Sequence, residues 1–144
     1  MLQPSIALNN LIDGCSNFRW NEFLVLDKWG IHAFPTNDRV YLNLIQTARK
    51  MELIRKYLND HPIEITSGYR PDKYNKLIGG APFSAHKLGM ACDFRHSKLK
   101  PDRVRELLEP VLDDFEIRME KLPGSSWVHI DTKLPGPGGR YFEP

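Results

Sequence analysis

The chain has 144 residues, a length typical of one domain, and its 41% hydrophobic and 26% charged residues are ordinary for a globular protein. Its 20 basic and 18 acidic residues give a net charge of +2, which argues against a dedicated nucleic-acid-binding protein, and no apolar run approaches the roughly 20 residues of a membrane span. Two cysteines, Cys15 and Cys92, exclude a disulfide-rich scaffold and a zinc site made mainly of thiolates, although one disulfide between them stays open.

The first half of the chain predicts an irregular N-terminal segment, one long helix and two strands. Residues 1–38 show no sustained periodicity, whereas apolar residues recur at helical spacing over residues 39–59. Alternating residues predict strands at 63–66 and 90–94. Between these strands, residues 68–85 are rich in Gly, Pro, Asn and Asp. A loop of this length in a small domain is often functional.

The second half predicts a shorter helix followed by a β-hairpin. We expect the helix to begin at Pro101, because proline is favoured in the first turn. Residues 115–120 and 127–131 alternate between apolar and polar types, and the Pro-Gly sequence between them favours antiparallel pairing. The tail, residues 134–144, is rich in Pro and Gly and is expected to be loose and flexible. The predicted fold is α+β, a small antiparallel sheet with helices packed on one side.

Two of the five histidines could bind a metal together with a carboxylate. His86 precedes the strand at 90–94, whose alternation turns Asp93 away from the core, and His129 comes from the last strand. Three protein ligands that leave a fourth position open are typical of catalytic zinc sites. The spacing alone is a weak signal, and His86 could instead cap a loop while Asp93 pairs with an arginine. The other histidines are expected to be exposed or to cap turns: His32, His61 and His96.

Three further polar residues could take part in chemistry at such a site. Glu120 lies on the polar face of the strand that pairs with the strand of His129, where it could be a general base or simply a solvated residue. Asp131 could orient His129 or carry surface charge. Arg70 follows the strand at 63–66, and its guanidinium could hold a substrate carboxylate or an oxyanion, or form a surface ion pair.

Four groups of residues occur in an order that resembles a known family. They are Ile65-Thr66-Ser67-Gly68-Tyr69-Arg70, Asn75 with Gly79-Gly80-Ala81, the run of Ser84, His86, Gly89, Ala91 and Asp93, and Trp127-Val128-His129-Ile130-Asp131. Together they resemble the M15 family of zinc peptidases, of the D-alanyl-D-alanine carboxypeptidase type, and above all its short phage-associated branch. The resemblance spans residues 18–133, and its most specific part is the Ser-x-His-x6-Asp element combined with the late Val-His-Ile-Asp strand.

The resemblance implies a site and a substrate. It implies that His86, Asp93 and His129 bind one zinc ion on the open face of the sheet. It also implies that Arg70 contacts the substrate or polarises its carbonyl group, and that Ser84 belongs to a loop signature that presents His86. Members of the family cleave peptide bonds in bacterial cell walls. Some remove a terminal D-alanine, whereas others, including phage endolysins, cut between L-alanine and D-glutamate.

One position departs from the pattern of the family. Several branches carry a catalytic acid three residues before the final histidine, where this chain has Ser126, which cannot act as that base. Glu120 is therefore our candidate for the catalytic base, and Asp131 is a weaker one. Tyr69 and Trp127 are candidates for packing against the substrate, although either could be structural, and Ser84 is a further candidate for binding the substrate.

The sequence thus predicts a zinc-dependent peptidase that hydrolyses a peptide bond of peptidoglycan, as a monomer with one domain over residues 1–144. The N-terminus shows no secretory signal, so we expect synthesis in the cytoplasm and action on the wall after holin-type release or as part of a virion. The alternative is a non-catalytic relative that keeps zinc but binds a wall or protein partner, or a phage structural protein.

Overall fold

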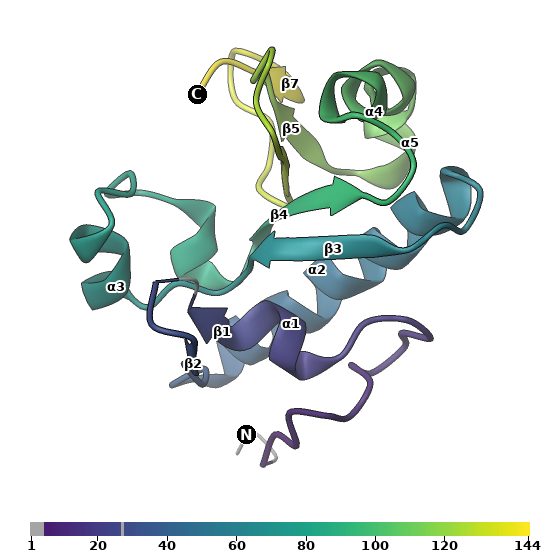
Figure 1. Cartoon of the computed structure of the whole chain (residues 1–144). Coiled ribbons are helices and arrows are strands. Elements are labelled where there is room, and N and C mark those ends of the chain that lie inside the picture. The colour runs from purple at the N-terminus through teal and green to yellow at the C-terminus, as the bar shows by residue number, and fades with distance from the viewer. Residues whose placement is uncertain (1–4, 27) are drawn as a thin grey trace.

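A five-stranded sheet packed against a long helix forms the centre of the molecule (Figure 1). The computed structural model describes residues 5–26 and 28–144, so the expectations for residues 1–4 and 27 lie outside the described residues. The strands are, in spatial order, β3 (Ile63–Ser67), β4 (Ala91–His96), β6 (Val128–Asp131), β5 (Arg118–Glu120) and β7 (Tyr141–Phe142). All neighbours are antiparallel except β5 and β7, which are parallel. The α+β prediction is therefore confirmed, with one parallel pairing that was not expected.

Two helices supply most of the helical side of the core. α2 (Asp38–Tyr57) begins where the Asn37 side chain accepts a hydrogen bond from the Val40 N–H, an N-cap interaction that satisfies a free backbone donor. α4 (Pro101–Leu108) begins at Pro101, as predicted. The shorter helical segments are α1 (Trp20–Leu24), α3 (Asp72–Leu77), η1 (Ala85–Leu88), η2 (Glu109–Val111) and α5 (Leu112–Phe115).

Strand alternation separates this core from the opposite face of the sheet. On β4, Cys92 and Phe94 are fully buried in one hydrophobic cluster with the apolar residues of α2 and α4. Asp93, between them, points to the other face, as the sequence predicted. The register of β4 and β6 pairs Asp93 with His129, and Asp131 follows two residues later on the same face. The sheet therefore brings these three polar side chains together.

Three segments that were expected to lack regular structure contain some. Residues 5–38 include α1 and a small hairpin of β1 (Val25–Leu26) and β2 (Ile31–His32), because α1 buries its apolar side in the core. The 68–85 loop contains α3. The expectation for residues 134–144 is wrong at β7, where β5 supplies the hydrogen bonds that the tail could not form alone. Two of them, from Met119 N–H to Arg140 O and from Lys121 N–H to Phe142 O, are each 2.7 Å long.

Both cysteines are free and buried, so the disulfide that composition left open is not formed. Burial, reinforced by the charge of Glu52, raises the pKa of the Cys15 thiol to about 12, and burial also raises the pKa of Cys92. Both side chains are therefore protonated and act as small apolar residues at neutral pH. No helix among the described residues is long and apolar enough to cross a membrane.

His96 is buried at the end of β4, so the expectation that it is exposed is wrong and the expectation that it caps a turn is confirmed. Its Nδ1 atom accepts hydrogen bonds from the backbone N–H groups of Lys98 and Leu99, both at 3.0 Å, so the ring caps the turn that follows the strand. Burial lowers the pKa of His96, and nearby His61 adds to this shift against an opposing hydrogen bond with the backbone of Leu58. The folded protein therefore resists protonation of this ring.

We expect the free energy of unfolding to decrease as the pH falls below about 6.5. Below this pH the unfolded chain binds a proton at His96, whereas the lowered pKa of His96 in the folded chain keeps its ring neutral to a lower pH. The substitution His96→Asn keeps a hydrogen-bond acceptor but removes the titrating ring, so it should flatten this dependence. Urea unfolding of both proteins at several pH values measures the effect. An unchanged slope in His96→Asn would refute the prediction.

Candidate metal centre

His86 is fixed in one tautomer by the turn that carries it. It lies in η1, where its backbone N–H donates to the Ser84 hydroxyl at 3.2 Å. Its ring Nδ1 lies 2.8 Å from the carbonyl oxygen of Gly68. Because a carbonyl can only accept, Nδ1 donates its proton there, which leaves Nε2 as the ring atom that can bind a metal. Glycine is needed at position 68, since a Cβ atom there would collide with the backbone of Phe23.

The long helix α2 holds this turn in place. The Asn43 side-chain amide donates to the Leu88 carbonyl at 2.9 Å, and the Thr47 hydroxyl lies 2.8 Å from the Gly89 carbonyl. Gly89 ends the turn with φ of +71°, a left-handed conformation that favours glycine. The position of His86 is thus set by helix, turn and strand together.

The three predicted ligands converge on one point. His86 Nε2 lies 3.3 Å from Asp93 Oδ1, and His129 Nδ1 lies 2.8 Å from the same oxygen. All three ligand atoms lie within 4.8 Å of one another, and all three residues are buried. Tetrahedral zinc with bonds near 2.0 Å places its ligand atoms about 3.3 Å apart, so the cluster fits one such ion with little movement.

The electrostatics of the cluster favour a positive charge at His129. Its Nδ1 faces Asp93, and its Nε2 lies 3.1 Å from Asp131 Oδ2. Burial alone would lower the pKa of His129, but hydrogen bonds to Asp131 and Asp93 outweigh it and raise the pKa to about 10. Burial would likewise raise the pKa of Asp93, yet hydrogen bonds from His129 and His86 hold it well below its usual value. A metal ion at Nδ1 would take the place of the proton that this environment stabilises.

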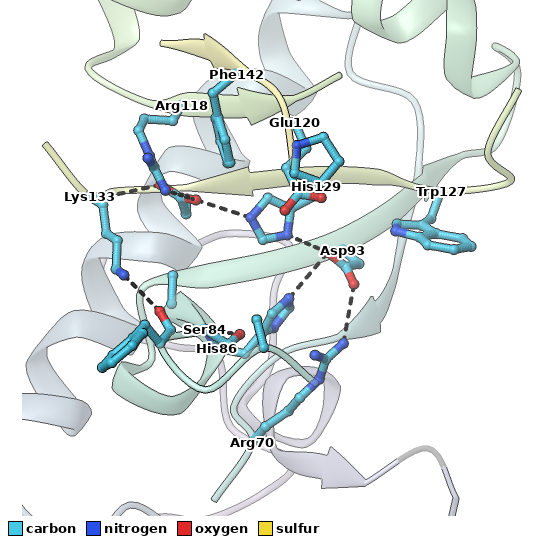
Figure 2. Close-up of a pocket in the computed structure, with 15 residues that line it drawn as sticks. Arg70, Ser84, His86, Asp93, Arg118, Glu120, Trp127, His129, Lys133 and Phe142 are labelled. Atoms are coloured by element: carbon cyan, nitrogen blue, oxygen red, sulfur yellow. Dashed lines mark hydrogen bonds and ion pairs between the residues drawn. The ribbon is translucent and has the colours of Figure 1, made fainter. Parts of the chain in front are cut away.

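A cavity of about 370 Å³ opens over this cluster (Figure 2). Arg70, Ser84, Glu120 and Trp127 all line it, so the structure brings these predicted residues to the three ligands. Tyr69 does not line the cavity. It is 5% exposed and belongs to the hydrophobic core, so its position supports the structural alternative and not contact with substrate.

The polar residues around the cavity differ in whether their side chains form hydrogen bonds or ion pairs with other residues. Arg70 donates from Nε to the Ser67 hydroxyl at 3.1 Å, and its Nη2 lies 3.5 Å from Asp93 Oδ2. The Glu120 carboxylate makes no hydrogen bond or ion pair with any other residue in the described part of the chain. Ser126 is exposed and lies outside the cavity.

Asp131 is held in place from the other side. Arg118 donates to its two carboxylate oxygens, from Nε at 2.7 Å and from Nη2 at 2.9 Å. Burial opposes ionisation of Asp131, but His129 and Arg118 outweigh it and lower the pKa of the carboxyl group. Both oxygens of Asp131 are therefore occupied, which favours the orienting role over the role of base.

Among the residues that line the cavity, two cationic and two aromatic side chains have no role in the sequence analysis: Arg118, Lys133, Phe83 and Phe142. Lys133 could have been found, because it continues the alternation of Trp127, His129 and Asp131 along one face. Arg118 lies two residues before Glu120 in β5, so strand alternation assigns it to the same face as Glu120. Phe83 and Phe142 lie in segments without periodicity, so no local signal pointed to either of them.

Comparison with known proteins agrees with the site. None of the curated proteins compared with the chain matches it. The family model described as Peptidase M15 matches residues 16–131, a span that contains the three converging ligands together with Arg70 and Glu120. The match covers well over half of the chain and stops short of β7. The cluster and the match thus lead to one conclusion, that this chain belongs to the Peptidase M15 family.

Proposed function

We propose that this protein is a zinc-dependent peptidase that hydrolyses a peptide bond of bacterial peptidoglycan. The observation that carries the proposal is the convergence of His86, Asp93 and His129 in a cavity that Glu120 and Arg70 also line. Family membership supports a metal-dependent peptidase. Zinc is supported by the ligand set, since two imidazoles and one carboxylate with an open fourth position are typical of hydrolytic zinc sites.

The residues around the cluster divide the work of hydrolysis. His86, Asp93 and His129 would hold the zinc ion, which would act as a Lewis acid toward a peptide carbonyl and lower the pKa of a bound water molecule toward about 7. The free Glu120 carboxylate accepts the proton of the attacking water and passes it to the leaving amine. Arg70 donates hydrogen bonds to the oxygen on which negative charge develops, or to a substrate carboxylate. Asp131 keeps His129 turned so that Nδ1 faces the cluster.

Cationic groups on both sides of the cluster support an anionic peptide as substrate. Figure 2 shows Lys133 and Arg70 on opposite sides of His86 and Asp93. Lys133 Nζ donates to the Phe83 carbonyl at 2.9 Å and forms no ion pair with another described residue. The stem peptide of peptidoglycan carries free carboxylates, which such groups bind through charge-assisted hydrogen bonds. Trp127, 40% exposed at the edge of the cavity, offers an apolar surface beside them.

Digestion of purified peptidoglycan, with the new chain ends identified by mass spectrometry, tests this function. We expect released fragments with new termini. Free D-alanine would indicate a carboxypeptidase. A new N-terminal D-glutamate would indicate cleavage after L-alanine, and this endopeptidase activity would suit a monomeric enzyme of phage-associated lysis. If protein that is shown to contain zinc releases nothing from several wall types, the proposal fails and a wall-binding role is favoured.

A further inference from the structure

The C-terminal strand lies outside the matched span of residues 16–131, yet it forms one side of the cavity. β7 continues the sheet beyond β5, where Phe142 is the register partner of Glu120. The segment is anchored by the hydrogen bonds between β5 and β7 and by an ion pair from Arg140 Nε to Asp113 Oδ1 at 2.7 Å. Phe142 is therefore a fixed part of the cavity wall and not the end of a loose tail.

The Phe142 ring lies over the guanidinium group that supports the metal centre. The Cζ atom of Arg118 is 4.0 Å from the ring centroid (Figure 2). Arg118 donates two hydrogen bonds to the Asp131 carboxylate, and Asp131 Oδ2 in turn contacts Nε2 of His129. The Phe142 ring also meets the His129 ring edge-on, with centroids 6.3 Å apart. One continuous set of contacts thus runs from the C-terminal strand to a predicted zinc ligand.

This arrangement shields a buried charge pair. The Asp131 side chain is 1% exposed, whereas that of Arg118 is 17% exposed, so the guanidinium is the member of the pair that water can reach. An aromatic face attracts a guanidinium through its quadrupole and keeps water from one side of it. The guanidinium of Arg118 is thus contacted by the Phe142 ring and by both carboxylate oxygens of Asp131.

We propose that Phe142 is a positioning residue of the metal centre, which holds Arg118 on Asp131 and so keeps His129 Nδ1 directed at Asp93 and His86. The inference rests on the proposed zinc site. It predicts that loss of the ring weakens zinc binding although Phe142 is not a ligand.

The test compares zinc affinities of full-length variants, measured by competition with a chromophoric chelator. Phe142→Leu should weaken zinc binding by about 2- to 30-fold, the range that corresponds to a cation–π contact. Phe142→Tyr, which keeps the ring, should restore most of the affinity. Tyr141→Leu is the matched control, since Tyr141 neighbours Phe142 on β7, packs against the core and does not line the cavity. It should lower the melting temperature and leave zinc affinity unchanged.

An Arg118→Met background separates positioning from a general loss of structure. If Phe142 acts through Arg118, then Phe142→Leu should have no further effect on zinc affinity in that background. The inference is overturned if Phe142→Leu binds zinc as tightly as wild type, or if Tyr141→Leu loses as much zinc affinity as Phe142→Leu. It is also overturned if Phe142→Leu still lowers zinc affinity in the Arg118→Met background. If the wild-type protein binds no zinc, the proposed function fails as well, so the two failures are distinguishable.

Discussion

Replacing His86 by alanine is expected to abolish both zinc binding and hydrolysis. The substitution removes one of three ligand atoms that lie within 4.8 Å of one another and leaves only Asp93 and His129. Loss of an outer partner of a zinc site already costs roughly 10- to 100-fold in affinity, and loss of a ligand should cost more. Zinc content after dialysis and the rate of release of new amino termini from peptidoglycan measure the two effects.

Two controls keep this result specific to the metal. His32→Ala removes a histidine from β2, far along the chain from the cluster and outside the cavity, and should change neither quantity. The melting temperature of metal-free His86→Ala shows whether the lost hydrogen bond to Gly68 has weakened the fold. A folded His86→Ala protein that binds zinc like the wild type would remove His86 from the ligand set.

Replacing Glu120 by glutamine is expected to lower kcat by about 100- to 10,000-fold, the usual contribution of a general base. Glutamine has nearly the same shape but cannot accept the proton of water. Because Glu120 makes no hydrogen bond or ion pair with another described residue and is not one of the three clustered ligands, zinc affinity and stability should stay near those of wild type. Rates on peptidoglycan and zinc affinity of the same preparation separate these effects.

Asp131→Asn distinguishes a base from an orienting residue. It weakens the contacts with His129 and Arg118, so we expect zinc affinity to fall roughly 10- to 100-fold. Glu120→Gln should show the opposite pattern, with slow hydrolysis and normal zinc binding. Full activity in Glu120→Gln would mean that the base lies elsewhere. Since Ser126 is exposed and outside the cavity, such a result would revive the role of Asp131.

Much of the fold was predictable because its strongest patterns are local. The apolar period of 3.6 residues located α2, and proline at position 101 located the start of α4. Alternation with a period of two assigned Asp93 to the face away from the core, and the antiparallel register of β4 and β6 makes it a neighbour of His129. Such patterns predict structure reliably because they record which side of a helix or strand is buried in the folded protein.

Other features depend on partners far away in the chain, and no local pattern reveals them. β7 forms where β5 presents free backbone groups to Tyr141–Phe142, two aromatic residues that suit a strand but follow a segment rich in Pro and Gly. The tautomer of His86 depends on the carbonyl of Gly68, and the support of Asp131 depends on Arg118. Tyr69 carried an aromatic ring next to Arg70, yet the core and not the cavity surrounds it.

The most direct test of a one-zinc peptidase is a titration of metal-stripped protein with zinc, in which the release of new amino termini from purified peptidoglycan is followed. We expect no release from the stripped protein, a rise with each addition, and a plateau at one zinc ion per chain. The His86→Ala protein should show no rise at the same zinc concentrations. Release that is unaffected by stripping, or none at any zinc concentration, would contradict a metal-dependent peptidase acting on the cell wall.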